Sequence, residues 1–69
     1  MMTSEEVAKL VAEVEEAVKD GDDEVAHSRE DDLHKAVLIA ISNGMCDDPA
    51  ACAAAAVKTV EMCFARWCA

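Results

Sequence analysis

Four cysteines have the widest range of possible chemistry in this chain, as metal ligands, redox centres or nucleophiles. They are Cys46, Cys52, Cys63 and Cys68. Their spacing does not match the paired ligand motifs of a structural zinc site. In one continuous helix, Cys52 and Cys63 would lie about 16 Å apart along the axis, which excludes a disulfide between them within one chain. Cys46 could pair with Cys52, and Cys68 with a cysteine of another chain. Thiols of cytoplasmic proteins are normally reduced, however, so we expect the four cysteines to serve as small buried hydrophobic residues.

A second group with ligand chemistry combines two histidines and two carboxylates, at His27, Glu30, Asp31 and His34. The two imidazoles would lie about 10.5 Å apart along a helix axis, too far to share an ion whose ligand bonds are about 2.1 Å long. At most, Glu30 and His34 could bind an ion whose coordination a second chain completes. We therefore expect no metal and no other cofactor, and instead local pairing of imidazole with carboxylate at helical spacing.

Other catalytic and phosphate-binding patterns are incomplete. Asp20, Asp22 and Glu24 resemble the oxygen ligands that open a calcium loop, but valine occupies the position that needs glycine. The two glycines of the chain stand at predicted helix ends and cannot form a phosphate-binding loop. Ser28 directly follows His27, and consecutive side chains diverge on a helix, so they do not form a nucleophile and its base. The sequence predicts that the protein is not an enzyme.

The first element that positions these side chains is a helix over residues 4–20. Thr3 and Glu6 have the spacing of a capping box, and apolar residues then recur at steps of three and four. Gly21 ends the pattern, because glycine tolerates the left-handed conformation that often follows a helix.

A second helix is predicted over residues 28–43. Ser28 and Asp31 form a pair with capping-box character, and the run from 37 to 41 is apolar on every side. This run predicts that the second helix is the most buried of the three. The sequence leaves residues 22–27 open between a loop and the acidic first turn of a longer second helix.

A third helix is predicted over residues 49–67. Asp48 supplies an N-cap carboxylate, and Pro49 fits the first helical position. Its end carries the only two aromatic residues of the chain. Trp67, with Arg66 beside it, is a candidate interface anchor, because tryptophan and arginine are enriched at binding hot spots.

The hydrophobic residues of this chain are numerous but small. They make up 54% of the 69 residues, yet 14 are alanine, 4 cysteine and 4 methionine, which leaves 15 valine, leucine, isoleucine, phenylalanine or tryptophan. Ordering a chain of this length costs on the order of 100 kcal/mol, and alanine methyl groups offset little of it. We therefore expect one all-α domain over residues 1–69, a three-helix bundle or a helical hairpin plus a helix, completed by homodimerisation.

The charge is strongly negative and unevenly distributed. Fifteen acids against six lysines and arginines give a net charge of -9, which runs from -7 over residues 1–24 through -3 over 25–48 to +1 over 49–69. Nucleic acids and anionic membranes bind clustered basic residues, so direct binding to either is disfavoured. The beginning lacks the features of a secretory signal, and no apolar stretch approaches the roughly 20 residues that cross a bilayer, so we expect a cytoplasmic protein.

Several short motifs give the chain a resemblance to known proteins. They are Ala26-His27-Ser28, Glu30-Asp31, Val37-Leu38, Ala40-Ile41 and the ending Phe64-Ala65-Arg66-Trp67-Cys68-Ala69. Over about its last two-thirds, the chain resembles small acidic helical proteins of unassigned function from actinobacteria and their phages. The resemblance implies that the protein acts in a bacterial cytoplasm, which is the host's cytoplasm if a phage encodes it. It also implies binding to the surface of a host protein. It implies no particular activity.

The sequence thus predicts a non-enzymatic protein-interaction module. Its predicted apolar contact residues are Val37, Leu38, Ile41, Val57, Val60, Phe64 and Trp67. Its predicted acidic face consists of Glu13, Glu16, Asp20, Asp22 and Asp23. These acids would steer a basic partner electrostatically, and mimicry of nucleic acid towards a DNA-binding protein is a special case. The alternative is a metal- or redox-responsive regulator that uses His27, His34 and the cysteines.

Overall fold

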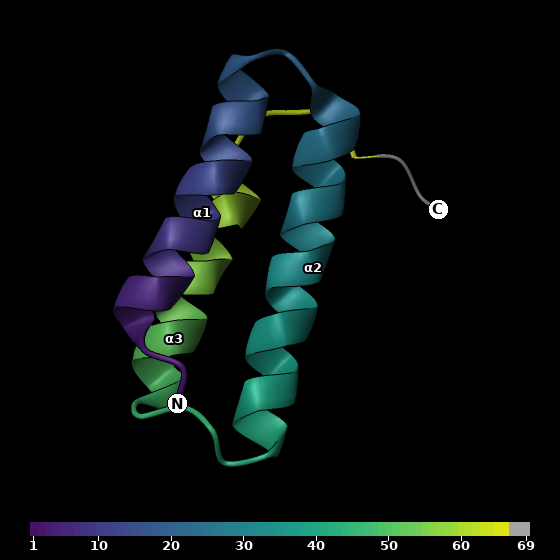
Figure 1. The fold of residues 1–69 in the computed structure, drawn as a ribbon. Helices are drawn as coiled ribbons and strands as arrows, with labels where there is room; N and C mark the ends of the chain where they lie inside the picture. Colours follow the sequence, from purple (N-terminus) through teal and green to yellow (C-terminus); the bar gives the residue numbers. More distant parts are fainter. Residues whose placement is uncertain (67–69) are drawn as a thin grey trace.

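The structure is a computed structural model that describes residues 1–66. Its helical segments are α1 (Ser4–Lys19), α2 (Asp23–Ser42), α3 (Pro49–Ala56) and the 3-10 helix η1 (Val57–Glu61). α1 and α2 form an antiparallel hairpin, and α3 packs against both of them (Figure 1). The prediction of an all-α fold with three helices is confirmed. Within residues 1–66, no helix is both long and apolar enough to cross a membrane.

α1 begins and ends where local signals place it. The Thr3 hydroxyl accepts a hydrogen bond from the Glu6 N–H at 3.2 Å and so caps the first turn. Gly21 adopts a φ of 74°, and the Asp22 N–H then donates to the Ala17 carbonyl at 3.0 Å. This pattern is a Schellman turn, which uses carbonyls that the helix end leaves free.

α2 begins at Asp23, so the predicted start at residue 28 is wrong. The Asp22 carboxylate accepts a hydrogen bond from the Val25 N–H at 3.1 Å and is the N-cap of α2. Asp22 therefore both completes the turn after α1 and caps α2, so no longer loop separates the two helices. Ser28 lies inside the helix and does not cap it, and the acidic first turn was the correct alternative for this segment.

α3 is much shorter than predicted, although its start is confirmed. The Asp48 carboxylate accepts from the Ala51 N–H at 3.1 Å, and Pro49 occupies the first turn. After Ala56 the backbone tightens into η1, so the predicted continuous helix to residue 67 is wrong. The Thr59 hydroxyl donates to the Ala56 carbonyl at 3.2 Å, and β-branched residues of this stretch have low helix propensity.

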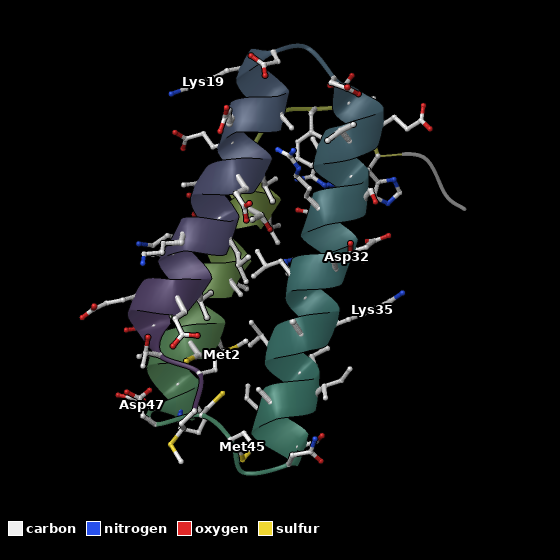
Figure 2. All side chains as sticks on the ribbon, in the orientation of Figure 1. Met2, Lys19, Asp32, Lys35, Met45 and Asp47 are labelled. Atoms are coloured by element: carbon white, nitrogen blue, oxygen red, sulfur yellow. The ribbon has the colours of Figure 1, made fainter. Side chains whose placement is uncertain are left out.

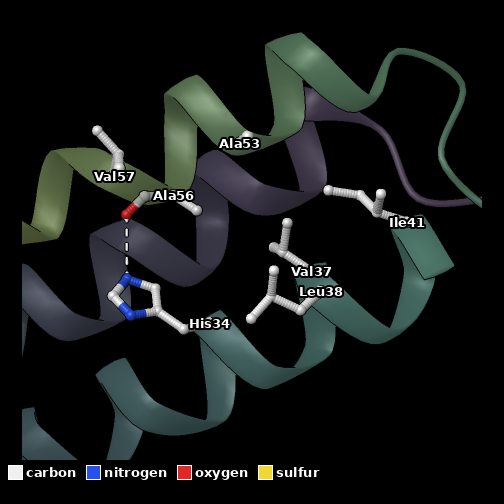
Figure 3. A pocket seen from close by; sticks show the side chains of 7 residues that line it. All are labelled: His34, Val37, Leu38, Ile41, Ala53, Ala56 and Val57. Carbon is white, nitrogen blue, oxygen red and sulfur yellow. Dashed lines mark hydrogen bonds between the residues drawn. The ribbon is translucent and has the colours of Figure 1, made fainter.

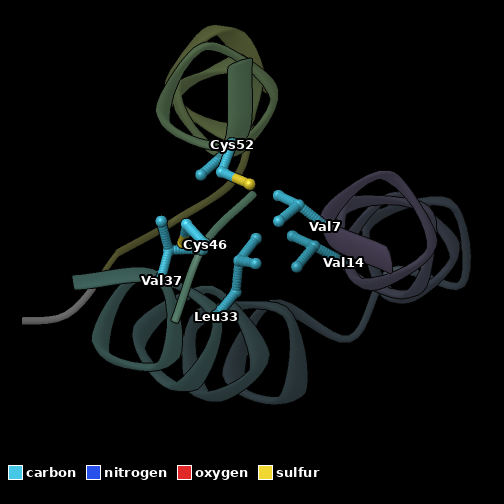
Figure 4. Packing of buried hydrophobic residues seen from close by; sticks show 7 residues of the cluster. Val7, Val14, Leu33, Val37, Cys46 and Cys52 are labelled. Atoms are coloured by element: carbon cyan, nitrogen blue, oxygen red, sulfur yellow. The ribbon is translucent and has the colours of Figure 1, made fainter. Parts of the chain in front are cut away.

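The core between the helices is built from small side chains (Figure 4). The buried cluster consists of Val7, Val14, Leu33, Val37, Cys46, Cys52 and Ala56. The apolar run, which led us to predict that the second helix is the most buried of the three, is itself largely exposed, since Leu38 is 66% and Ile39 59% exposed. Of Val37, Leu38 and Ile39, only Val37 faces the core, since within residues 1–66 α2 has α1 and α3 as neighbours on one side and no helix on the other.

The N-terminal residues are tied to the connection between α2 and α3. The Met2 N–H donates to the Met45 carbonyl at 2.7 Å, and the Asp47 N–H donates to the Met2 carbonyl at 3.1 Å. These bonds form a parallel bridge between Met2 and Cys46. Figure 2 shows Met2, Met45 and Asp47 at this end of the molecule, opposite the turn between α1 and α2.

Candidate functional site

An apolar groove lies between the C-terminal half of α2 and α3 (Figure 3). It has a volume of about 220 Å³ and is lined by His34, Val37, Leu38, Ile41, Ala53, Ala56 and Val57. Leu38 and Val57 are 66% and 60% exposed, so bulky side chains on both helical segments border it. This arrangement offers an apolar hollow beside protruding apolar side chains, which suits binding of another apolar surface.

The groove lies in the least acidic part of the molecule. Residues 33–42 of α2 contain one charged side chain besides a histidine, Lys35, and residues 49–60 contain only Lys58. Both segments therefore lack carboxylates, although the chain has 15 of them. An approaching apolar surface would meet little of the negative charge that the molecule carries elsewhere.

The predicted acidic face lies away from this groove. Its members are Glu13, Glu16, Asp20, Asp22 and Asp23, on α1, the α1–α2 turn and the first residue of α2. All are exposed except Asp23, which is half-buried. The turn is at the opposite end of the hairpin from the residues that form the groove (Figure 1). The five acids are thus spread along α1 and around the α1–α2 turn, away from the apolar residues that line the groove.

The predicted apolar contact residues are divided between the groove and its surroundings. Val37, Leu38, Ile41 and Val57 line it. Val60 is 62% exposed on η1, whereas Phe64 is half-buried against the core. The predicted anchor Trp67 lies outside the described residues.

An ion pair between the exposed Arg66 and the buried Glu30, which sequence reasoning missed, joins the C-terminal segment to α2. Arg66 Nε and Nη2 donate to the two carboxylate oxygens of Glu30 at 2.8 and 3.2 Å. Arg66 Nη2 also donates to the carbonyls of Thr59 at 2.7 Å and Met62 at 3.2 Å, and its guanidinium lies 3.9 Å from the centre of the Phe64 ring. Arg66 therefore holds the segment after η1 across the bundle.

The environment of Glu30 favours its charged form. Burial by itself raises the pKa of this carboxyl group, which is only 5% exposed. The hydrogen bonds and charge of Arg66, with smaller effects of the Thr59 hydroxyl and His34, outweigh burial and hold the pKa of Glu30 below its usual 4.5. The ion pair is thus a charged element of the folded state.

The histidines occupy two separate environments. His34 Nε2 lies 2.9 Å from the Thr59 hydroxyl and 3.4 Å from the Ala56 carbonyl, which favours the tautomer with a proton on Nε2. His27 Nε2 lies 3.4 Å from Asp31, one helical turn away. The Glu30 carboxylate, which the sequence offered as an ion ligand together with His34, forms its ion pair with Arg66 instead. Among residues 1–66, no group of three or more metal-binding side chains is assembled.

The cysteines also differ in position. Cys46 and Cys52 are buried in the core and Cys63 is exposed, whereas Cys68 lies outside the described residues. Burial raises the pKa of the Cys52 thiol, and the neighbouring Cys46 thiol and the carboxylates of Asp47 and Asp48 raise it further. Cys46 and Cys52 thus fit the prediction of small buried hydrophobic residues, whereas Cys63 does not.

No protein-family model, curated protein or solved structure matches this chain. The groove, the acidic face and the ion pair of Arg66 with Glu30 are therefore the basis for inferring function.

Proposed function

We propose that this protein is a non-enzymatic protein-interaction module, and that the groove between α2 and α3 is its docking site. The observation that carries the proposal is the groove itself, an apolar hollow bordered by the exposed side chains of Leu38 and Val57. Exposing apolar side chains of this kind to water is unfavourable, so covering them with a partner's apolar surface makes binding more favourable.

The occupant we propose is a second copy of the chain. A symmetric dimer pairs the same surface on both subunits, so a suitable surface must contain both a protrusion and a hollow that receives it. Leu38 supplies the protrusion, and the hollow beside it has walls of Ala53 and Ala56, whose short side chains leave room. Two copies could each place Leu38 in the groove of the other.

The distribution of charge supports this occupant. Two copies of net charge -9 repel one another, so self-association requires contact through a face without carboxylates. The segments 33–42 and 49–60 are the parts of the groove-forming elements that meet this requirement. Salt should strengthen such a dimer by screening the remaining repulsion.

Sedimentation equilibrium of the wild type and two single variants tests the dimer. We expect Leu38→Glu to weaken self-association at least tenfold, because it places a carboxylate in an apolar contact. Ile39→Glu is the matched control, since Ile39 is 59% exposed on the next position of α2 but does not line the groove. A wild type that stays monomeric at about 100 μM, or equal effects of the two variants, would contradict the proposal.

We further propose that the acidic face, which the dimer leaves uncovered, steers a basic partner such as a DNA-binding protein of a bacterial host. The exposed carboxylates around the α1–α2 turn support this role, because steering needs unpaired charge at the surface.

Binding to such a partner should weaken as salt increases, whereas salt should strengthen the dimer. Affinity capture from bacterial lysate, compared with a variant in which Glu13, Glu16, Asp20 and Asp23 are amides, tests it. Capture that survives both high salt and these substitutions would exclude steering and nucleic-acid mimicry.

A further inference from the structure

We propose that Cys46 and Cys52 form a redox site, in which a low-molecular-weight disulfide such as oxidised glutathione converts the two thiols to an intrachain disulfide across the beginning of α3. This site is separate from the groove. The inference therefore stands whether or not the groove binds a second copy.

The two cysteines lie on either side of one helix cap. Asp48 is the N-cap of α3, Cys46 stands two residues before it, and Cys52 is the fourth residue of the helix. Side chains on the two sides of an N-cap can pack together, as in the hydrophobic staple, where the residue directly before the cap contacts the fourth helical residue; Cys46 stands one residue further out. Here the two cysteines belong to one buried cluster, and the Cys46 thiol is near enough to raise the pKa of Cys52 (Figure 4).

The backbone on both sides of the pair is fixed by hydrogen bonds. The Met2 carbonyl accepts from the Asp47 N–H, next to Cys46, and also from the Cys52 Sγ at 3.9 Å. The Cys52 N–H donates to the Asp48 carbonyl at 3.0 Å. Because the N-terminal residues, the connecting segment and α3 meet here, both cysteines are anchored around the Met2 carbonyl.

The surroundings favour a disulfide over a metal complex. Cys52 is fully buried and Cys46 is 8% exposed, and Asp47 and Asp48 add negative charge nearby. A metal would keep two thiolates in this apolar and negative environment, and zinc would need two further ligands. No such cluster of ligands exists within residues 1–66. A disulfide carries no charge and needs no additional ligand.

The reaction is a pair of thiol–disulfide exchanges. Cys46 is the more exposed thiol and attacks one sulfur of the oxidant, which breaks the oxidant's S–S bond and releases the first small thiol. Cys52 then attacks the Cys46 sulfur of the mixed disulfide and releases the second. The two protein protons leave on the released thiols, the two cysteine sulfurs are oxidised, and the oxidant is reduced. The raised pKa of Cys52 makes its attack slow in the closed fold, so the reaction needs opening of the connecting segment.

The bond would have a defined structural effect. It would join the connection after α2 to α3, and thereby fix the helix that supplies Ala53 and Ala56 to the groove. Because closing a short loop also restricts the unfolded chain, we expect the oxidised protein to melt at a temperature higher by about 5 °C or more.

Asp47 and Asp48 allow a direct test, because they lie between the two cysteines. A Cys63→Ser, Cys68→Ser variant is equilibrated with oxidised glutathione, alkylated, and digested without reductant by a protease that cleaves before aspartate. We expect the peptide that ends at Cys46 to stay linked to the peptide that contains Cys52, and a reductant to separate them. The same oxidised sample should show the higher melting temperature.

Two further variants make the result decisive. Adding Cys52→Ala to the test protein should abolish both the linked peptides and the rise in melting temperature. Adding Leu38→Glu should leave both unchanged, which separates this site from the proposed dimer. The proposal is overturned if equilibrated protein shows only free or glutathionylated Cys46, or if the linked protein melts no higher than the reduced protein.

Discussion

Glu30 occupies a position in α2 that the helix otherwise gives to apolar side chains. Ala26, Leu33 and Val37 are the other buried residues of α2, and together with Glu30 they follow the three- and four-residue steps of one helical stripe. A carboxylate in such a stripe needs a partner. The sequence shows the stripe, but it does not show the partner. Arg66 lies 36 residues away, inside the predicted third helix, and reaches Glu30 because the real chain departs from that helix after Ala56.

The ion pair predicts an asymmetric response to mutation. Arg66→Met leaves the Glu30 carboxylate buried without its partner and should lower the free energy of unfolding by about 2 kcal/mol. Adding Glu30→Met removes that penalty, so the double variant should be more stable than Arg66→Met alone. Urea unfolding of the wild type and the three variants of this cycle measures the coupling. Strictly additive effects would mean that the two side chains do not interact in solution.

The lowered pKa of Glu30 predicts a specific dependence of stability on pH. The folded state binds the Glu30 proton less readily than the unfolded state, so this group adds stability at pH values above its usual 4.5. That contribution is lost as the pH falls from about 4.5 through the lower folded-state pKa. The difference in unfolding free energy between wild type and Glu30→Gln should therefore shrink over this range. A difference that stays constant from pH 7 to pH 3 would contradict the assignment.

Helix starts were predictable where one cap residue was unambiguous. Thr3 before α1 and Asp48-Pro49 before α3 act through hydrogen bonds within a few residues, and both predictions hold. The start of α2 was harder, because Asp22 and Ser28 are both acceptable cap residues. The end of α3 was missed although the β-branched residues after Ala56 weaken the helix locally, since the same segment is also held by the distant contact of Arg66 with Glu30.

Asp22 should contribute more to stability than its exposed position suggests. Asp22→Ala removes the acceptor of the Val25 N–H and should cost about 1 kcal/mol. Asp22→Asn keeps an acceptor and should cost only a few tenths of a kcal/mol, which makes it the matched control. Thermal unfolding of both variants distinguishes a capping role from a purely electrostatic one. Equal losses for alanine and asparagine would exclude the cap.

At the scale of the whole molecule, the charge pattern and the scarcity of large apolar side chains were evident from composition. The groove was not, because it depends on the face of α2 that packs inward. Val37 points inward while Leu38 remains exposed, because the positions of α1 and α3 determine which face of α2 is buried. The sequence therefore predicted most groove-lining residues as apolar contacts but did not predict their arrangement.

The excess of negative charge predicts that salt stabilises the fold. Raising NaCl from about 20 to about 500 mM at constant protein concentration screens repulsion between exposed carboxylates and should raise the melting temperature by several degrees. The variant Asp20→Asn, Asp23→Asn removes two charges near the α1–α2 turn and should respond less. A melting temperature that falls with salt would show that attractive pairs, such as Glu15 with Lys19, outweigh repulsion.

The glycines that follow α1 and α2 both adopt positive φ, 74° at Gly21 and 68° at Gly44, and neither has an atom within 4 Å of where a Cβ would lie. Positive φ is the preferred region of amino acids of the opposite chirality. A chemically synthesised chain with D-alanine at both positions would adopt this φ without strain, and the added methyl groups would restrict the unfolded state. Two stereocentres would thus stabilise the folded bundle and leave every natural side chain of the groove unchanged.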